Sequence, residues 1–133
     1  MEWPSVRDTV DLHIHSGPCL FPRIGDDYEI AMKAREAGMQ AIALKSPFES
    51  TVGRAYHTMK RVGGIKIFGG LVLNHWAGGI NPYAVETTLR LGGRLIWMPT
   101  FDAEYHAKVF GGTGKYYQKT MAIESRSKGI NIL

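Results

Sequence analysis

The sequence lacks several features that define whole classes of protein. It contains one cysteine, Cys19, which excludes a disulfide within the chain. No stretch approaches the roughly 20 consecutive apolar residues of a transmembrane helix, which argues against a membrane span. The opening Met-Glu-Trp-Pro has neither the basic nor the apolar region of a secretory signal peptide. Together these absences predict a cytoplasmic protein with no membrane partner.

Dense charge is absent as well. The net charge of +4 reflects 16 Lys and Arg against 12 Asp and Glu, without a basic block or a nucleic-acid-binding motif. We therefore predict no nucleic-acid partner, and we interpret the excess charge as a mild preference for anionic ligands or as an aid to solubility. With 133 residues, of which 44% are hydrophobic, the chain is expected to form one domain around one core.

The sequence does contain a repeated unit, an apolar strand followed by an amphipathic helix. Strands are predicted at residues 9–15, 41–46, 66–74 and 94–100. Helices are predicted to begin at a capping box formed by Asp26 and Glu29, near residues 50–51, and at Asn81-Pro82. The later strands are nearly continuous apolar runs, which is typical of a parallel sheet covered by helices.

Beyond residue 102 this pattern fades. Residues 103–128 are expected to form a loop with a helix at 116–128, and residues 130–133 to open a fifth strand. The whole chain, residues 1–133, then forms one α/β unit of parallel (β/α)₄ repeats, the first half of a TIM-type barrel that needs about 250 residues. Such a half-barrel leaves sheet edges and an apolar face open, so we expect a homo-oligomer or a piece of a longer chain.

The most informative motif is Asp11-Leu-His-Ile-His15, at the end of the first predicted strand. Strict alternation along a strand puts Asp11, His13 and His15 on one face and the apolar residues on the other. Two imidazoles one residue apart can bind one divalent cation, and Gly17 ends the strand just beyond them. His13 and His15 are therefore predicted metal ligands, with zinc or manganese as the expected ion. The alternative is a pair of polar residues on a half-buried strand.

Polar residues also lie at the carboxyl ends of the later predicted strands. Lys45 lies at the tip of the second, Asn74 and His75 lie at the tip of the third, and Asp102 lies just past the fourth. Because the carboxyl ends of parallel strands meet at one rim, where barrel enzymes build their sites, we predict Lys45, His75 and Asp102 as catalytic residues. The alternatives are a carboxylate partner for Lys45, packing of His75 against Trp76, and a turn-capping role for Asp102.

One further motif predicts less than it first suggests. The run Gly111-Gly-Thr-Gly-Lys115 is similar to the end of a phosphate-binding loop. That pattern needs glycine where Val109 stands and serine or threonine where Tyr116 stands. We therefore predict no nucleotide cofactor.

The segment Asp11–Gly17 resembles the metal motif of the amidohydrolase superfamily and is similar to that of the polymerase-and-histidinol-phosphatase type of phosphoesterase. Further segments resemble an uncharacterised branch of amidohydrolase-like proteins, namely Arg35–Met39, Ala43–Ser46, Phe68–Asn74, Gly79–Pro82 and Trp97–Thr100. This resemblance implies a TIM-barrel hydrolase with one or two divalent metals and a metal-activated water. His13 and His15 carry over as ligands of the first strand.

The chain departs from both patterns. A metal-bridging lysine of the amidohydrolases belongs to strand four, whereas Lys45 is on predicted strand two. Lys45-Ser-Pro47 stands where the phosphoesterases have an Asp-His pair after strand two. The later ligands of the superfamily would lie beyond Leu133. We expect hydrolysis of a C–N or ester bond in a small molecule. The alternatives are a phosphoesterase, or a catalytically incompetent half-barrel that binds metal and oligomerises.

Overall fold

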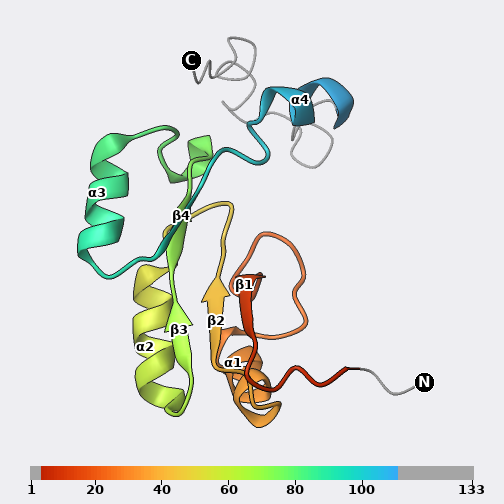
Figure 1. Cartoon of the computed structure of the whole chain (residues 1–133). Coiled ribbons are helices and arrows are strands. Elements are labelled where there is room, and N and C mark those ends of the chain that lie inside the picture. The colour runs from red at the N-terminus through yellow and green to blue at the C-terminus, as the bar shows by residue number, and fades with distance from the viewer. Residues whose placement is uncertain (1–3, 111–133) are drawn as a thin grey trace.

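Parallel strands and helices alternate along the chain in the computed structural model, which describes residues 4–110 (Figure 1). The strands are β1 (Val10–Ile14), β2 (Ala41–Leu44), β3 (Lys66–Phe68), β4 (Gly70–Val72) and β5 (Leu95–Trp97). The helices are α1 (Asp27–Glu36), α2 (Val52–Val62), α3 (Pro82–Arg90) and α4 (Glu104–Phe110), and a 3₁₀ turn, η1 (His75–Ala77), follows β4. Each pairing between these strands is parallel, so the predicted α/β fold with parallel strands is confirmed.

Neighbouring strands follow the order of the chain. β1 pairs with β2 and β2 with β3, whereas β4 pairs with β5. β3 and β4 belong to one extended segment divided at Gly69, whose carbonyl accepts a 2.9 Å hydrogen bond from the Arg94 backbone N–H. A Cβ at position 69 would lie 2.5 Å from the Val52 Cα, so this close approach to α2 requires glycine. The predicted single strand over residues 66–74 is therefore wrong.

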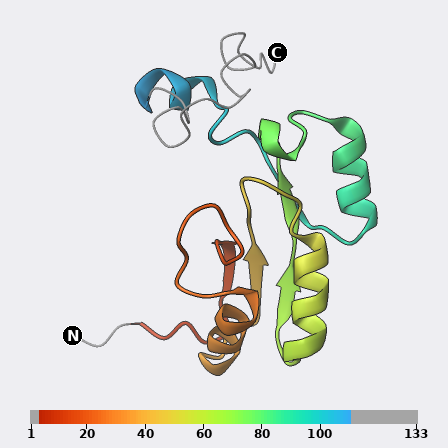
Figure 2. The same cartoon turned by 180° about the vertical axis from the view of Figure 1, so that it is seen from behind.

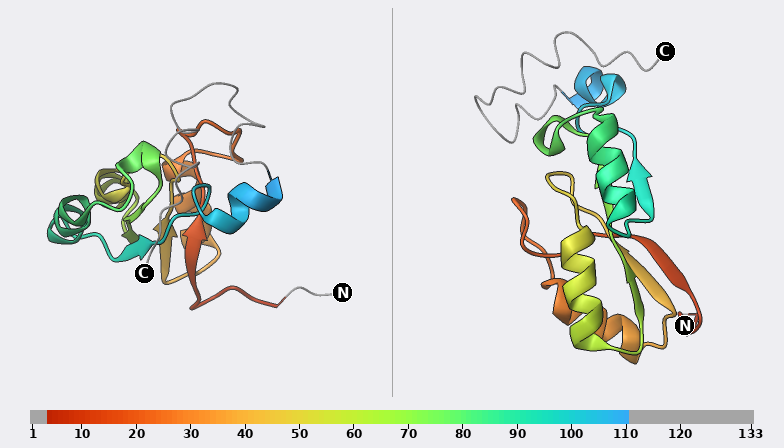
Figure 3. Two further views of the ribbon diagram at one scale, coloured as in Figure 1. Left: turned by 90° about the horizontal axis from the view of Figure 1, so that it is seen from above. Right: turned by 90° about the vertical axis from the view of Figure 1, so that its left-hand side faces the viewer.

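Helices α1, α2 and α3 lie along one side of the strands when the molecule is seen from above (Figure 3). The core lies between this helix layer and the strands, and its buried members are Ile30, Ala31, Ala34, Ile42, Leu44, Ala55, Val62, Ile65 and Ile67. Burying one large aliphatic side chain stabilises a fold by roughly 1.5–3 kcal/mol. The residues that alternate with the core residues along β2 and β3 point the other way. We call that side of the strands the inner face, and it carries Ala41, Ala43, Lys45, Lys66 and Phe68.

Strand β1 contains a β-bulge. Asp11 pairs with Ile42 but Ile14 pairs with Leu44, so three residue steps on β1 match two on β2. The cause is local, because Asp11 Oδ1 accepts a 2.8 Å hydrogen bond from the His13 backbone N–H and so diverts that N–H from the strand ladder. Ile42 and Leu44 both face the helices, so Asp11 and Ile14 face the helices too.

The bulge decides which side of the sheet the histidines occupy. His13 and His15 flank Ile14 and therefore lie on the inner face, whereas Asp11 lies on the helix side. The prediction that Asp11 shares a face with both histidines is wrong, because it assumed strict alternation through the whole strand. Val10 pairs with Ala41, which is on the inner face, so Val10 lies on the inner face as well.

Two predicted helix starts are confirmed. Asp26 and Glu29 form a capping box, in which each side chain accepts a hydrogen bond from the other residue's backbone N–H, at 2.8 and 2.9 Å. Asn81 Oδ1 accepts from the Tyr83 N–H at 3.0 Å, and Pro82 takes the first helical position. Both motifs act over three residues, which explains why the sequence alone predicts them.

Other predicted bounds differ. The second and fourth predicted strands end earlier, at Leu44 and Trp97, because Pro47 and Pro99 have no N–H to continue a ladder and the chain turns before them. The loop predicted from residue 103 is wrong over Glu104–Phe110, where a helix forms and Glu104 pairs with Lys108 at 2.5 Å one turn later. The helix and strand expected at 116–128 and 130–133 lie outside the described residues. Within residues 4–110, no helix has the length and apolar character to cross a membrane.

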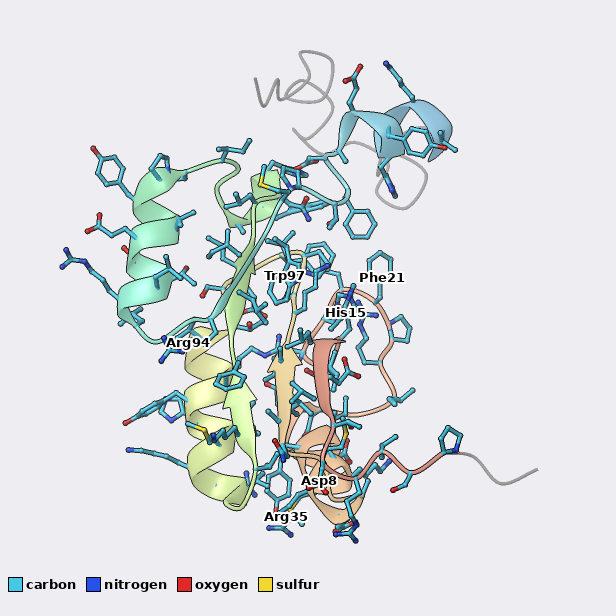
Figure 4. The ribbon with its side chains drawn as sticks, viewed as in Figure 1. Asp8, His15, Phe21, Arg35, Arg94 and Trp97 are labelled. Carbon is cyan, nitrogen blue, oxygen red and sulfur yellow. The ribbon has the colours of Figure 1, made fainter. Side chains whose placement is uncertain are left out.

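The amino ends of β1, β2 and β3 border a cavity of about 880 Å³. Its lining combines loop residues with the first residues of the strands, namely Asp8, Val10, Arg35, Gly38, Met39, Gln40, Ala41, Gly64, Ile65, Lys66 and Phe68. Asp8 and Arg35 lie at one end of the strands, and His15 and Trp97 lie at the other (Figure 4). The cavity is therefore at the end opposite to the predicted site residues.

Candidate metal and acid–base site at the carboxyl ends of the strands

His13 and His15 meet at the carboxyl end of β1. Their Nε2 atoms are 3.0 Å apart and their ring centroids 4.9 Å apart, with the rings steeply inclined. Imidazole nitrogens bind zinc at about 2.0–2.1 Å, and two nitrogens this close can both reach a single ion at that distance. The pair therefore fits two positions of a divalent metal site. Without a cation, the same distance suits a hydrogen bond between neutral rings.

The surroundings of both imidazole rings favour the neutral form, which is the form that binds a metal. Burial, followed by the charge of Lys45, lowers the pKa of His13 below its ordinary value. Burial, followed by the charge of Arg23, lowers the pKa of His15. Because only the unprotonated nitrogen can bind a cation, these shifts favour metal binding at neutral pH.

Lys45 stands beside the pair, one residue beyond the end of β2. Its side chain lies on the inner face, and the residue is only 7% exposed. The ammonium Nζ is 3.4 Å from His13 Nε2 and 5.2 Å from the centroid of the Trp97 ring. Burial lowers the pKa of Lys45. A Cβ at Gly70 would come within 2.6 Å of the Trp97 ring, so this glycine makes room for the indole beside the lysine.

His75 and Asp102 form a dyad beyond β4 and β5. His75 Nδ1 lies 2.7 and 2.9 Å from the two carboxylate oxygens, and the His75 backbone N–H donates to Asp102 Oδ2 at 2.5 Å. The Asp102 side chain is 3% exposed, and His75 Nε2 is buried without a hydrogen-bond partner in residues 4–110. A carboxylate on Nδ1 fixes the orientation of the ring and leaves Nε2 to accept or donate a proton, or to bind a metal.

Asn74 ties the later loops together and is fully buried. Its Oδ1 accepts from the Thr100 N–H at 2.9 Å, while Nδ2 donates to the Pro47 carbonyl at 3.2 Å and to Thr100 Oγ1 at 3.0 Å. One amide thus joins the chain after β2, β4 and β5. This places Asn74 as a structural support of the rim, next to His75 in the chain.

The sequence-predicted site residues therefore form two groups at one end of the sheet. His13, His15 and Lys45 form the first, and His75 with Asp102 form the second. In the part of the chain that the structure describes, no three His, Cys, Asp or Glu side chains gather closely enough to hold a metal ion. The histidine pair supplies two ligands, and a complete site needs more from water, substrate or another segment.

Arg54, on α2, is an organising residue that the sequence analysis missed. Its guanidinium forms hydrogen bonds with Asp27 at 2.7 and 2.8 Å and with Glu49 at 2.8 Å. It also donates to the carbonyls of Ser16, Gly17 and Pro18 at 3.0–3.2 Å, while the Ser16 hydroxyl donates to Asp27.

These bonds hold the loop that directly follows His15, and Figure 2 shows this loop leaving β1 and returning to α1. Arg54 thereby fixes the backbone at the base of the histidine pair. No local sequence pattern signals this role, because Arg54 lies 27 to 38 positions from most of its partners.

An aromatic cluster at the same end was also missed. Rings from four successive loops contact one another, namely Phe21, Phe48, Trp76 and Phe101. Phe48 meets Trp76 edge to face at 5.0 Å, and Phe101 stacks on Phe48 at 6.4 Å between centroids. Each ring comes after a predicted strand. An aromatic residue that recurs at this position could have predicted the cluster from the sequence. The cluster gives the rim an apolar part beside its polar groups.

Comparison with known proteins gives one match. Residues 8–133 match a protein family of unknown function, DUF6282. Searches among curated proteins and among solved structures find no match. Because the match covers nearly the whole sequence, the chain belongs to this family.

Proposed function

We propose that this family member is a metal-dependent hydrolase of a small molecule, with His13 and His15 as metal ligands. The observation that carries the proposal is the 3.0 Å approach of the two Nε2 atoms at the carboxyl end of β1, beside the buried Lys45. The resemblance of Asp11–Gly17 to the amidohydrolase metal motif supports the same function. The bond cleaved is then a C–N or ester bond.

The chain's own residues divide the work of such a reaction. A divalent ion, zinc or manganese, would supply Lewis-acid chemistry and bring the pKa of a water molecule toward neutrality. His75 Nε2, which is buried and has no hydrogen-bond partner in the described residues, is the candidate proton acceptor or donor, and Asp102 holds His75 through Nδ1. Lys45 contributes a positive charge next to His13 that can bind a substrate group. The aromatic cluster supplies an apolar wall.

A phosphoester is the second candidate substrate. The observation in its favour is the placement of a lysine ammonium 3.4 Å from a predicted metal ligand. Phosphoryl oxygens carry negative charge, which a lysine can neutralise as a point charge.

We further propose that the fold is half of a TIM-type barrel. Two observations support this: the strands are adjacent in chain order, and helices α1, α2 and α3 lie on one side of them. A doubly wound sheet reverses its strand order and carries helices on both faces. Within the described residues, β1 pairs only with β2 and β5 only with β4, which leaves two strand edges open.

Open edges favour association with further strands. We expect a homo-oligomer in which a second chain covers an edge or the inner face. Sedimentation of the full chain at micromolar concentration tests this. A species larger than a monomer is expected, whereas a monomer that melts cooperatively contradicts the half-barrel and favours a compact domain complete in itself.

Metal content tests the proposed function directly. Protein purified without chelator and supplied with zinc or manganese is expected to hold the ion, and the His13→Ala, His15→Ala double variant is expected to lose it. The matched control is His57→Ala, because His57 is an exposed histidine on α2. Equal metal content in all three proteins would disprove the metal site. Metal binding without turnover of amide, ester or phosphoester substrates would favour the catalytically incompetent half-barrel.

A further inference from the structure

Lys45 is a buried cation without an anion. The residue is 7% exposed, and within residues 4–110 it forms no ion pair with a carboxylate. Its ammonium instead lies near a neutral acceptor, His13 Nε2 at 3.4 Å, and near the Trp97 ring, whose centroid is 5.2 Å away. Removing an ammonium from water costs several kcal/mol unless an opposite charge compensates for it.

A partly buried cation elsewhere in the molecule, Arg54, is by contrast fully compensated. Arg54, whose side chain is 14% exposed, lies 2.7 Å from Asp27 and 2.8 Å from Glu49, and it also binds three backbone carbonyls. Arg54 is therefore a structural cation, whereas Lys45 is left to interact with an anion from outside the described residues. The nearby Asp11 carboxylate is on the helix side of β1, where it accepts the His13 backbone N–H.

A second cation lies in the loop that follows the histidine pair in the chain. Arg23 is half-buried, and its Nε has no hydrogen-bond partner in the described part of the chain. Its guanidinium carbon stands 5.7 Å from the centroid of the Phe21 ring, so it belongs to the loop that reaches the aromatic cluster. Its positive charge is close enough to His15 to lower the pKa of that imidazole. Guanidinium and ammonium groups together are the usual recognition set for oxyanions.

We propose that Lys45 and Arg23 bind an oxyanion of the substrate, a phosphate or a carboxylate, next to the histidine pair. The inference rests on the proposed function and names the substrate class of the same site. The anion supplies the charge that the buried Lys45 lacks, and it places the adjoining bond of the substrate beside His13 and His15. An uncharged substrate would leave Lys45 uncompensated.

Anion binding by metal-free protein tests this inference separately from the metal site. The full chain is treated with chelator, and inorganic phosphate and acetate are titrated in by calorimetry. Wild type is expected to bind at least one of them, and Lys45→Met is expected to weaken that binding about tenfold or more, the loss of one charged hydrogen bond. Lys66→Met is the matched control, because Lys66 is an exposed lysine on the inner face at the opposite end, and binding should be unchanged.

Two further variants keep the test decisive if Lys45→Met does not fold. Lys45→Arg retains the positive charge and is therefore expected to retain anion binding. Loss of anion binding in Lys45→Arg would show that charge at this position is not enough. Arg23→Met is expected to weaken binding. Preference for phosphate over acetate would identify a phosphorylated substrate, and the reverse a carboxylate. Either supports the inference.

The inference is overturned if folded wild type binds neither anion, or if Lys45→Met binds as well as wild type. The proposed function can fail independently of these outcomes. If the double histidine variant retains its metal while Lys45→Met loses anion binding, the metal site is wrong and the oxyanion site stands. If anions bind only after metal loading and regardless of Lys45, the oxyanion site is wrong and the metal site stands.

Discussion

The two ends of the sheet differ in a way that cavity size does not reveal. The amino end has the cavity of about 880 Å³, with Asp8, Arg35 and Lys66 among its lining residues. The carboxyl end has His13, Lys45, Asn74 and Asp102, of which the last three are at least nine-tenths buried and held by specific contacts.

Both ends are charged, but only the carboxyl end keeps polar groups out of water and oriented toward one another. Burial and fixed orientation are what strengthen electrostatic interactions and position reacting groups. Converging side chains that are held by their neighbours therefore identify this candidate site better than open space does.

The largest effect is expected from acid. Protons compete with the metal for His13 and His15, so affinity falls by up to about a hundredfold per pH unit once both rings titrate. Burial lowers both pKa values from 6.5, so the loss should begin below pH 6.5. Metal retention after dialysis at pH 4.5–7.5 measures this, with His57→Ala as the control that keeps the wild-type profile. Retention that does not depend on pH would show that other groups hold the ion.

Breaking the Arg54 network is expected to have the next largest effect. Arg54→Met leaves the Asp27 carboxylate, 12% exposed, without its partner, which typically costs about 3 kcal/mol of unfolding free energy. Urea denaturation measures the loss, and metal affinity should fall as well because the loop after His15 is released. Arg90→Met is the control, since the Arg90 pair with Glu86 is exposed and its loss should cost about 0.5 kcal/mol or less.

Removing the Asn74 amide is expected to cost less. Asn74→Ala leaves the Thr100 N–H and the Pro47 carbonyl without their buried partner, a loss of about 2 kcal/mol. Asn81→Ala, which removes only a helix cap, is expected to cost about 1 kcal/mol. If the two losses are equal in thermal or urea unfolding, Asn74 does not support the rim as described.

The smallest effect is expected at the amino end. Lys66 is exposed at the edge of the cavity, so Lys66→Met should change the unfolding free energy by no more than about 0.5 kcal/mol. Metal content should match that of wild type. Loss of metal in this variant would mean that the cavity end takes part in the site, and the contrast between the two ends would fail.

The sequence predicted features that depend on neighbouring residues. The caps at Asp26 and Asn81 act within one turn, and the apolar runs suffice to indicate parallel strands covered by helices. The pattern also placed Lys45 and Asp102 at the carboxyl ends of their strands, which parallel strands bring to the same edge of the sheet.

Features that depend on distant contacts were not predictable in this way. The division at Gly69 reflects the approach of α2, and the role of Arg54 depends on partners brought near by folding. The pairing of His75 with Asp102 joins residues 27 positions apart, so the sequence pointed to each of them but not to their bond. The bulge in β1 was missed because an Asx-type hydrogen bond competes with the ladder, and hydrophobic alternation does not register that competition.

That bulge has a consequence for how the motif should be compared between proteins. Asp11 is a conformational determinant: it sets the phase of the strand, and the phase decides which side of the sheet receives the imidazoles. A relative that retains both histidines but replaces the aspartate by a residue unable to capture the His13 N–H would present them toward the helices. The aspartate two residues before the first histidine thus determines how the strand is rotated. Matching the two histidines alone therefore does not establish a shared metal site.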